Sequence, residues 1–87
     1  MQILWSKDFE KRYRKVDRKI KKSFNKRVEL FETDPFHSLL DNHSLHGKWK
    51  GYRSINVTGD WRAVFKMTGA RTAYFVEIGT HPYLYGT

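Results

Sequence analysis

The sequence predicts a single α+β domain, in which an N-terminal strand and a helical region pack on a C-terminal antiparallel sheet. Two observations carry this prediction. Apolar residues recur every three or four positions in the first half of the chain, and the second half contains three runs of β-branched and aromatic residues separated by turn residues. Helices covering one face of a sheet give two layers around one core. With 87 residues and no internal repeat, we expect one domain over 1–87.

A helix is predicted to begin directly after the first strand. Residues 2–5, Gln-Ile-Leu-Trp, are a short strand candidate. Ser6 follows as a suitable N-cap, because its hydroxyl can accept a hydrogen bond from the first helical turn. Asp8 and Glu10 lie in that turn, where the partial positive charge of the helix terminus favours acidic side chains.

The region after this cap is strongly amphipathic. Between residues 9 and 31, apolar side chains recur at steps of three or four, and Lys and Arg fill the opposite face. Asp17 can cap a second helix, so the region is either one long helix or a hairpin of two, and periodicity does not distinguish them. Pro35 ends the region, because helical backbone is disfavoured at the residue before a proline.

Three consecutive strands are predicted in the second half of the chain, at residues 52–57, 62–67 and 72–78. They are separated by Thr58-Gly59-Asp60 and Thr68-Gly69-Ala70, both of which are good turn sequences. Strands joined by such short turns form an antiparallel meander. The intervening stretch between the helical region and these strands is the least regular part of the chain.

The net positive charge lies entirely in the predicted helical region. Residues 7–27 contain 11 Lys or Arg and three acidic residues, whereas the remainder contains six basic and six acidic residues. A basic segment of this kind attracts RNA or DNA without sequence preference. We favour a nucleic acid as its partner, with an acidic protein as the main competitor and a merely solvated helix face as the third explanation.

Composition also limits the class of protein. The chain contains no cysteine, which excludes disulfides and thiolate metal sites and fits a reducing cytoplasm. No apolar stretch is long enough to predict a signal peptide or a membrane span. We therefore expect a soluble cytoplasmic protein that does not associate with membranes.

The chain contains four histidines, His37, His43, His46 and His81. Imidazole is the side chain expected to titrate near neutral pH. His43 and His46 have a spacing that can bind a metal ion on a helix, with Asp60 or His81 as a third ligand. The adjacent glycine and basic residues disfavour both a helix and a bound cation, so we expect no metal site. His37 lies in a loop and is assigned no role.

Two charged residues in and after the Thr58-Gly59-Asp60 turn allow alternative interpretations. Asp60 either stabilises the turn by bonding its own backbone or presents a carboxylate that takes or orients a proton, and local sequence favours the turn. Alternation along the strand places Arg62 and Val64 on one face, and Ala63 and Phe65 on the other. Arg62 therefore faces either solvent or a site, where a guanidinium would hold a phosphate.

Aromatic and basic residues are interleaved around these groups. Trp49, Tyr52 and Trp61 are able to stack on nucleic-acid bases. Aromatic residues at alternating strand positions are more often core residues, so we expect these three mostly in the core, with Trp61 largely buried. Lys66 also lies in this half of the sequence, together with the basic residues considered below.

Several blocks of the chain match one known family in the right order. They are Asp41-Asn42-His43-Ser44-Leu45, Gly47-Lys48-Trp49-Lys50-Gly51-Tyr52-Arg53, Val57 through Trp61, Gly79-Thr80-His81 and Leu84-Tyr85-Gly86. With these motifs the chain resembles the RelE/ParE superfamily of bacterial toxins from toxin–antitoxin systems, specifically its YafQ-like branch, over nearly its whole length. The resemblance implies an N-terminal strand and helical hairpin packed on a C-terminal antiparallel sheet, the RelE-like two-layer microbial RNase fold.

The resemblance implies a ribosome-dependent endoribonuclease that cleaves messenger RNA in the ribosomal A site, without a metal or other cofactor. The ribose 2′-hydroxyl would attack the adjacent phosphate and the 5′-oxygen would leave, which requires a base, an acid and cations around the phosphorane. By similarity, His43, Asp60 and His81 lie at catalytic positions. Asp60 or His43 would be the base and His81 the acid. Arg62 would stabilise the phosphate, as an arginine does in the RelE branch proper, and Tyr85 would help to hold the RNA.

Two positions depart from the YafQ-like pattern. Asn56 stands where that branch has another histidine, and an amide cannot donate and recover a proton as an imidazole does, although it can hydrogen-bond a phosphate or sugar. Arg62 stands where YafQ-like proteins tend to be apolar. The change at Asn56 leaves three alternatives, which are a weaker nuclease, heavier use of His43 and lost activity.

The implied partners are a cognate antitoxin protein, the ribosome with its RNA, and messenger RNA. Further RNA contacts are expected from Asn56, His46, Lys48, Lys50, Arg53, Lys21, Lys22 and Lys26. The alternative class is a non-nuclease ParE-like toxin that poisons a protein target, or a catalytically impaired RelE-fold binding protein. In that class the three matched residues His43, Asp60 and His81 would be dispensable. A third alternative is a small basic nucleic-acid-binding domain without toxicity.

Overall fold

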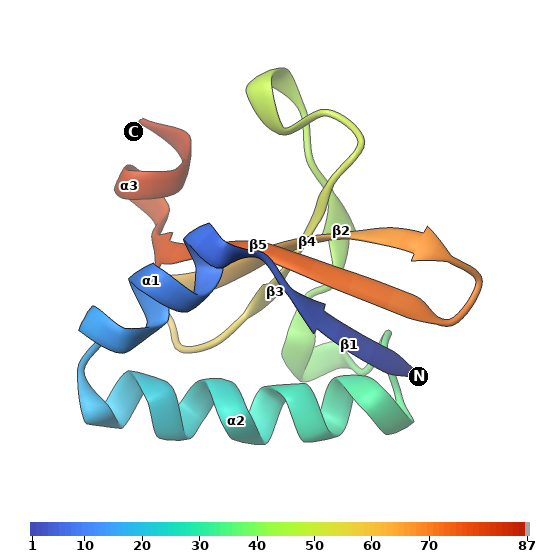
Figure 1. The fold of residues 1–87 in the computed structure, drawn as a ribbon, viewed down its shortest axis with the longest axis horizontal. Coiled ribbons are helices and arrows are strands. Elements are labelled where there is room, and N and C mark those ends of the chain that lie inside the picture. The colour runs from blue at the N-terminus through green and yellow to red at the C-terminus, as the bar shows by residue number, and fades with distance from the viewer. Residues whose placement is uncertain (87) are drawn as a thin grey trace.

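The computed structural model describes residues 1–86 and shows one five-stranded sheet with two helices packed along one face (Figure 1). Along the chain the elements are β1 (Gln2–Trp5), α1 (Lys7–Lys15), α2 (Arg18–Thr33), η1 (Ser38–Leu40), β2 (His43–Ser44), η2 (Gly47–Trp49), β3 (Arg53–Asn56), β4 (Trp61–Gly69), β5 (Thr72–Thr80) and α3 (His81–Tyr85). The predicted α+β class is confirmed. None of the helices within these residues is long and apolar enough to span a membrane.

The amphipathic region forms two helices, because the chain turns at Val16 and Asp17. Val16 has extended backbone (φ −78°, ψ 145°), its N–H closes α1 on the Tyr13 carbonyl, and its side chain is buried. Asp17 occupies the N-cap position of α2, although its carboxylate makes no capping hydrogen bond. Ser6 caps α1 as predicted, since its Oγ accepts a hydrogen bond from the Phe9 N–H at 2.9 Å.

The strand order of the sheet is β1-β5-β4-β3-β2. The meander β3-β4-β5 is antiparallel as predicted, and β1 pairs in parallel with β5 at one edge. β4 and β5 are longer than predicted, because their pairing begins at Trp61 and Thr80 and continues to Gly69 and Thr72. The two-residue strand β2 at the other edge was not predicted, since two residues carry no periodicity.

The main core lies between the two helices and the sheet. Phe75 of β5 is 0% exposed and occupies its centre, with its ring centroid within 6.0 Å of five other aromatic rings. These rings belong to Trp5, Phe9, Phe24, Phe31 and Phe65. The chain has no disulfide, and this aromatic cluster supplies much of its buried apolar surface.

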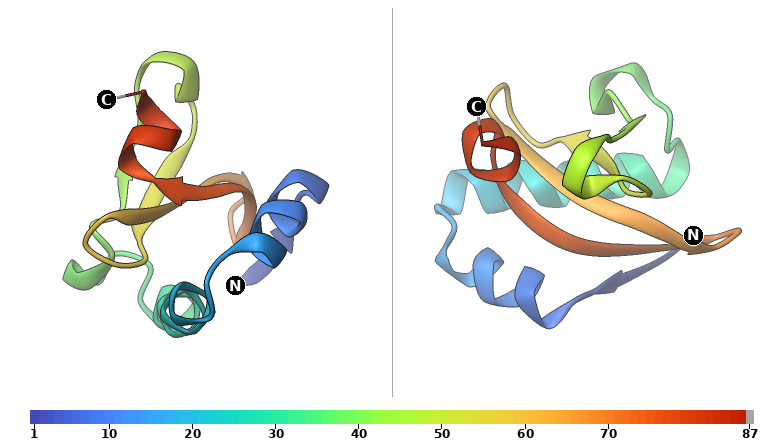
Figure 2. Two further views of the ribbon diagram at one scale, coloured as in Figure 1. Left: turned by 90° about the vertical axis from the view of Figure 1, so that its left-hand side faces the viewer. Right: turned by 90° about the horizontal axis from the view of Figure 1, so that it is seen from above.

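A second, smaller cluster of apolar side chains lies on the opposite face of the sheet. The end-on view shows α3 and the segment that contains η2 on the side of the sheet away from α2 (Figure 2). The buried members of this cluster are Leu45, Val64 and Leu84. Trp49, Tyr52 and Trp61 are each half-buried, so the expectation that Trp61 is largely buried is met only in part. All three rings lie at the margins of a cluster. The Trp49 indole N–H donates to the Leu84 carbonyl at 3.0 Å and thereby holds η2 against α3.

Candidate active site

The sheet topology gathers several predicted site residues at one end of the sheet. β3 ends, β4 begins and β5 ends there, because the three strands alternate in direction. Asn56 of β3 pairs with Arg62 of β4, which pairs in turn with Gly79 of β5. The Asp60 carbonyl accepts a hydrogen bond from the His81 N–H at 3.1 Å, so the β3–β4 turn is joined to the start of α3.

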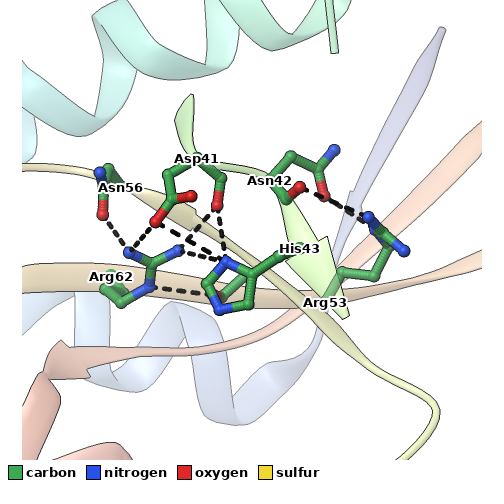
Figure 3. Close-up of polar contacts among 7 residues, drawn as sticks. Asp41, Asn42, His43, Arg53, Asn56 and Arg62 are labelled. Carbon is green, nitrogen blue, oxygen red and sulfur yellow. Dashed lines mark hydrogen bonds and ion pairs between the residues drawn. The ribbon is translucent and has the colours of Figure 1, made fainter. Parts of the chain in front are cut away.

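Arg62 is buried and its guanidinium donates hydrogen bonds to three residues (Figure 3). Nε donates to Ser54 Oγ at 2.9 Å, and Nη1 donates to the Asn56 side-chain oxygen. Asp41 accepts two hydrogen bonds from Arg62. Nη1 donates to the Asp41 carboxylate at 3.5 Å, and Nη2 donates to the Asp41 backbone carbonyl at 3.1 Å. Arg62 is only 8% exposed, and a buried cation needs such paired and hydrogen-bonded surroundings.

His43 lies on β2 beside this network, with its side chain 49% exposed. Its Nδ1 is 2.8 Å from the carbonyl oxygen of Asp41 and 3.4 Å from Nη2 of Arg62. Asp41 reaches both neighbours because its backbone is left-handed (φ 46°, ψ 48°). Asp and Asn adopt that conformation more readily than most other side chains.

His81 and Tyr85 lie one turn apart on α3, with their ring centroids 4.6 Å apart in an edge-on arrangement. The helix begins at this place because Thr80 caps it, its Oγ1 accepting from the Tyr83 N–H at 3.4 Å, and because Pro82 occupies its first turn. His81 is exposed and Tyr85 is half-buried. The end of the sheet is therefore flanked by one imidazole on β2 and another on α3.

Contacts from α1 and β5 hold α3 in place. The Arg12 guanidinium lies 3.8 Å from the centre of the Tyr83 ring, and its Nε is 3.6 Å from Glu77 Oε1. The Tyr83 ring covers Gly79, since a Cβ at that position would lie 2.4 Å from Tyr83 Cδ2. A glycine is required on β5 for this close approach, and the approach determines where His81 lies.

Glu77 gives this region a pH-dependent stability. Burial raises its pKa above the ordinary 4.5, and this effect outweighs the hydrogen bond from the Ile78 N–H and the attraction of Arg12, both of which lower the pKa. The folded state therefore holds the Glu77 proton more tightly than the unfolded state does. It follows that the contribution of Glu77 to the free energy of unfolding falls as the pH rises above its ordinary pKa.

We expect Glu77→Gln to remove this pH dependence. The free energy of unfolding of the variant should increase relative to that of the native chain as the pH rises from about 4 to about 7, because glutamine has no proton to lose. Urea unfolding at several pH values measures the difference. Glu32→Gln, on the exposed face of α2, is the comparison variant and is measured at the same pH values. A difference between Glu77→Gln and the native chain that stays constant with pH would contradict the prediction.

The remaining predicted RNA contacts are divided between two faces. His46, Lys48 and Lys50 are exposed on and beside η2, on the same side of the sheet as α3. The three lysines of α2 lie on the helical side, away from η2 and α3 (Figure 2). They are Lys21, Lys22 and Lys26.

Arg53 lies at the start of β3 and is half-buried. Its Nε donates to Asn42 Oδ1 at 2.8 Å, and its guanidinium lies 5.4 Å from the Phe36 ring. The α2 lysines are therefore not brought to the sheet end that carries Arg62, whereas Arg53 bonds to the residue between Asp41 and His43.

Residues to which the sequence assigned no role complete the site. Asp41, Ser54 and Arg12 make the contacts described above. An aspartate two residues before the matched histidine was the available signal for Asp41, because Asp is favoured in left-handed backbone. Within residues 1–86, no group of three or more His, Asp or Glu side chains is arranged as ligands for a metal ion.

The order of elements and the five-stranded sheet match a family of bacterial toxins of type II toxin–antitoxin systems. The family model described as the bacterial toxin of type II toxin–antitoxin systems, YafQ, matches residues 1–86. The chain belongs to this YafQ family, so the resemblance to the YafQ-like branch of the RelE/ParE superfamily is confirmed.

Similar proteins agree with this assignment. The mRNA interferase toxin YafQ of Escherichia coli strain K12 is 39% identical over 54 residues, 62% of this chain. The chain spans 58% of the length of the curated relatives it matches. A crystal structure of a YafQ mutant from Escherichia coli matches with a TM-score of 0.82 and 28% identity, covering 98% of each chain. The structure of the Escherichia coli DinJ–YafQ toxin–antitoxin complex matches with a TM-score of 0.74 and 29% identity, covering 98% of this chain and 97% of the other.

Proposed function

We propose that this chain is an endoribonuclease toxin that cleaves messenger RNA on the ribosome and is neutralised by a cognate antitoxin. The observation that carries the proposal is the placement of two imidazoles, His43 and His81, on either side of one sheet end in a member of the YafQ family. Support also comes from the Escherichia coli relative, which is named an mRNA interferase.

In the proposed reaction the ribose 2′-hydroxyl attacks the adjacent phosphorus and loses its proton to a base. The bond to the 5′-oxygen breaks, and an acid gives that oxygen a proton. The products are a 2′,3′-cyclic phosphate and a 5′-hydroxyl end. We assign the acid to His81, and the base to His43 or Asp60, all of which lie near the same end of the sheet. In this proposal the protein side chains carry both proton transfers, without a metal ion.

Tyr85 would hold RNA beside His81, since an aromatic ring at that position can stack on a base. The exposed His46, Lys48 and Lys50 would contact the RNA backbone on the same side of the sheet.

The basic residues of α2 would serve a separate contact with ribosomal RNA, because α2 lies on the other face of the sheet. Lys21, Lys22 and Lys26 belong to this surface. The protein partner expected for a toxin of this class is an antitoxin, since DinJ–YafQ is a toxin–antitoxin complex. Charge attraction would speed the encounter with either partner.

Cleavage of a messenger RNA on programmed ribosomes tests the proposal. We expect the native protein to cut the message and leave a 2′,3′-cyclic phosphate, and a single 2′-deoxynucleotide at the cut site to abolish cleavage there. His81→Ala should slow cleavage by about 10²–10⁴-fold, the usual worth of one acid–base group.

Two results would contradict the proposal. Growth arrest by both the native chain and His81→Ala, with unchanged transcript ends in primer extension, would favour the ParE-like alternative. Cleavage that leaves a 3′-hydroxyl end would exclude attack by the 2′-hydroxyl.

A further inference from the structure

We propose that Asp41 and Arg62 are positioning residues for His43, and that they hold its imidazole with Nδ1 protonated and Nε2 available to accept the 2′-hydroxyl proton. This inference rests on the proposed function and deepens it. It selects His43 over Asp60 as the base, and it gives Arg62 a role that does not involve the phosphate.

The position of the His43 proton follows from its two neighbours. Nδ1 lies 2.8 Å from the Asp41 carbonyl, which can only accept, and 3.4 Å from Arg62 Nη2, which can only donate. The nitrogen cannot satisfy both. The shorter contact has the length of a full hydrogen bond, whereas the longer one is at the limit for such a bond. The Asp41 carboxylate, 3.7 Å away, also favours a proton on Nδ1.

Arg62 is bonded within the protein and is largely closed to an RNA phosphate. A guanidinium has five N–H donors, and four hydrogen bonds from Arg62 reach Ser54, Asn56 and Asp41. Its side chain is 10% exposed, whereas that of His43 is 49% exposed. The exposed group is therefore the imidazole, and the buried guanidinium fixes the carbonyl to which that imidazole bonds.

The two departures from the YafQ-like pattern are in contact with each other, since Asn56 accepts a hydrogen bond from Arg62. A histidine at position 56 would place a second group capable of positive charge against the guanidinium. An amide oxygen is instead a neutral acceptor. The pair thus forms one unit, in which Asn56 and Ser54 orient Arg62, and Arg62 orients Asp41.

Asp60 is less suited to act as the base. It is exposed in the β3–β4 turn, and its backbone carbonyl is bonded to the His81 N–H. This contact uses the main chain of Asp60 and not its carboxylate. Asp60 thereby joins the turn to α3, which places it among the residues that position His81.

Substitutions that separate charge from geometry test the proposal. Arg62→Lys keeps the positive charge but loses the planar fork, and Arg62→Met loses both. We expect each to lower kcat by about 10–100-fold with little change in KM, because displacement of a base by about 1 Å has an effect of that order. Asp41→Asn keeps a side chain suited to left-handed backbone and should give a smaller decrease.

The nitrogen spectrum of the imidazole provides a readout that does not depend on cleavage. In a long-range ¹H–¹⁵N spectrum of the neutral side chain, His43 should show a proton on Nδ1 in the native protein. In Arg62→Met, His43 should show a mixture of the tautomer protonated on Nδ1 and the tautomer protonated on Nε2. The matched controls are Arg71→Lys and Arg71→Met, in the exposed turn at the opposite end of β4, and both should behave as the native chain.

Two outcomes would overturn the proposal. One is near-native cleavage by Arg62→Lys together with a large loss in Arg62→Met, which would show that charge on the phosphate matters rather than the fork. The other is a native His43 with its proton on Nε2. Failure of the native protein to cleave RNA would refute the proposed function instead, and the spectrum would still decide whether Asp41 and Arg62 orient His43.

Discussion

Replacing His43 with asparagine is expected to lower the rate of RNA cleavage by about 10²–10⁴-fold while leaving the protein folded. The asparagine amide nitrogen would occupy the place of Nδ1 and could still donate to the Asp41 carbonyl, which lies 2.8 Å from that atom. No atom would replace Nε2, so the proton acceptor would be lost. Single-turnover cleavage of a message on programmed ribosomes measures the rate, and circular dichroism checks the fold.

The matched control is the same substitution at a histidine outside the site. His37 Nδ1 accepts a hydrogen bond from the Leu39 N–H at 3.1 Å, and the side-chain oxygen of asparagine can accept it equally well. His37→Asn should therefore cleave at the native rate. A His43→Asn protein within about threefold of the native rate would contradict the assignment of His43 as the base.

Replacing Phe75 with alanine is expected to lower the free energy of unfolding by about 3–5 kcal/mol, the range for a buried phenylalanine. Phe75 is 0% exposed and lies among five other aromatic rings, so little can move to fill the space. A domain of this size has roughly 5–15 kcal/mol of stability in total, and the variant should unfold at a much lower urea concentration.

Phe36→Ala removes a ring of the same size from an exposed position and serves as the comparison. Phe36 is 67% exposed, and its described contact is with the Arg53 guanidinium at 5.4 Å. We expect a loss of no more than about 1 kcal/mol, the value of an exposed cation–π contact. Similar midpoints for the Phe75 and Phe36 variants, measured by urea unfolding, would show that the cluster around Phe75 is not the main source of stability.

The sequence predicted the longer elements because each of them repeats its pattern several times. The helical region over residues 9–31, the Ser6 cap and the β3-β4-β5 meander are all confirmed. β2 and α3 were not predicted, since two and five residues are too few for periodicity to appear. β2 is held by its pairing with β3, and α3 by the hydrogen bond from the Trp49 indole to the Leu84 carbonyl.

In the candidate site, too, the residues themselves were predicted from the sequence, whereas their long-range contacts were not. The motif resemblance picked out His43, Asp60, Arg62 and His81, and the structure places them near one end of the sheet. Their catalytic roles remain predictions. The partners of Arg62 could not be predicted from local sequence, because one of them, Asp41, is 21 positions away and meets it only through the pairing of β2, β3 and β4.

The sequence by itself determined the class of fold, the basic helical face and the family of the protein, because these depend on composition, spacing and motif order. Only the tertiary structure decided which groups bond to one another. It showed that Arg62 is buried against Asp41 and Asn56 while His43 remains exposed. It also showed that Arg12 of α1 holds α3 through Tyr83. Burial and hydrogen-bond partners arise from side chains brought together across the sheet, and these contacts are absent from any local pattern of residues.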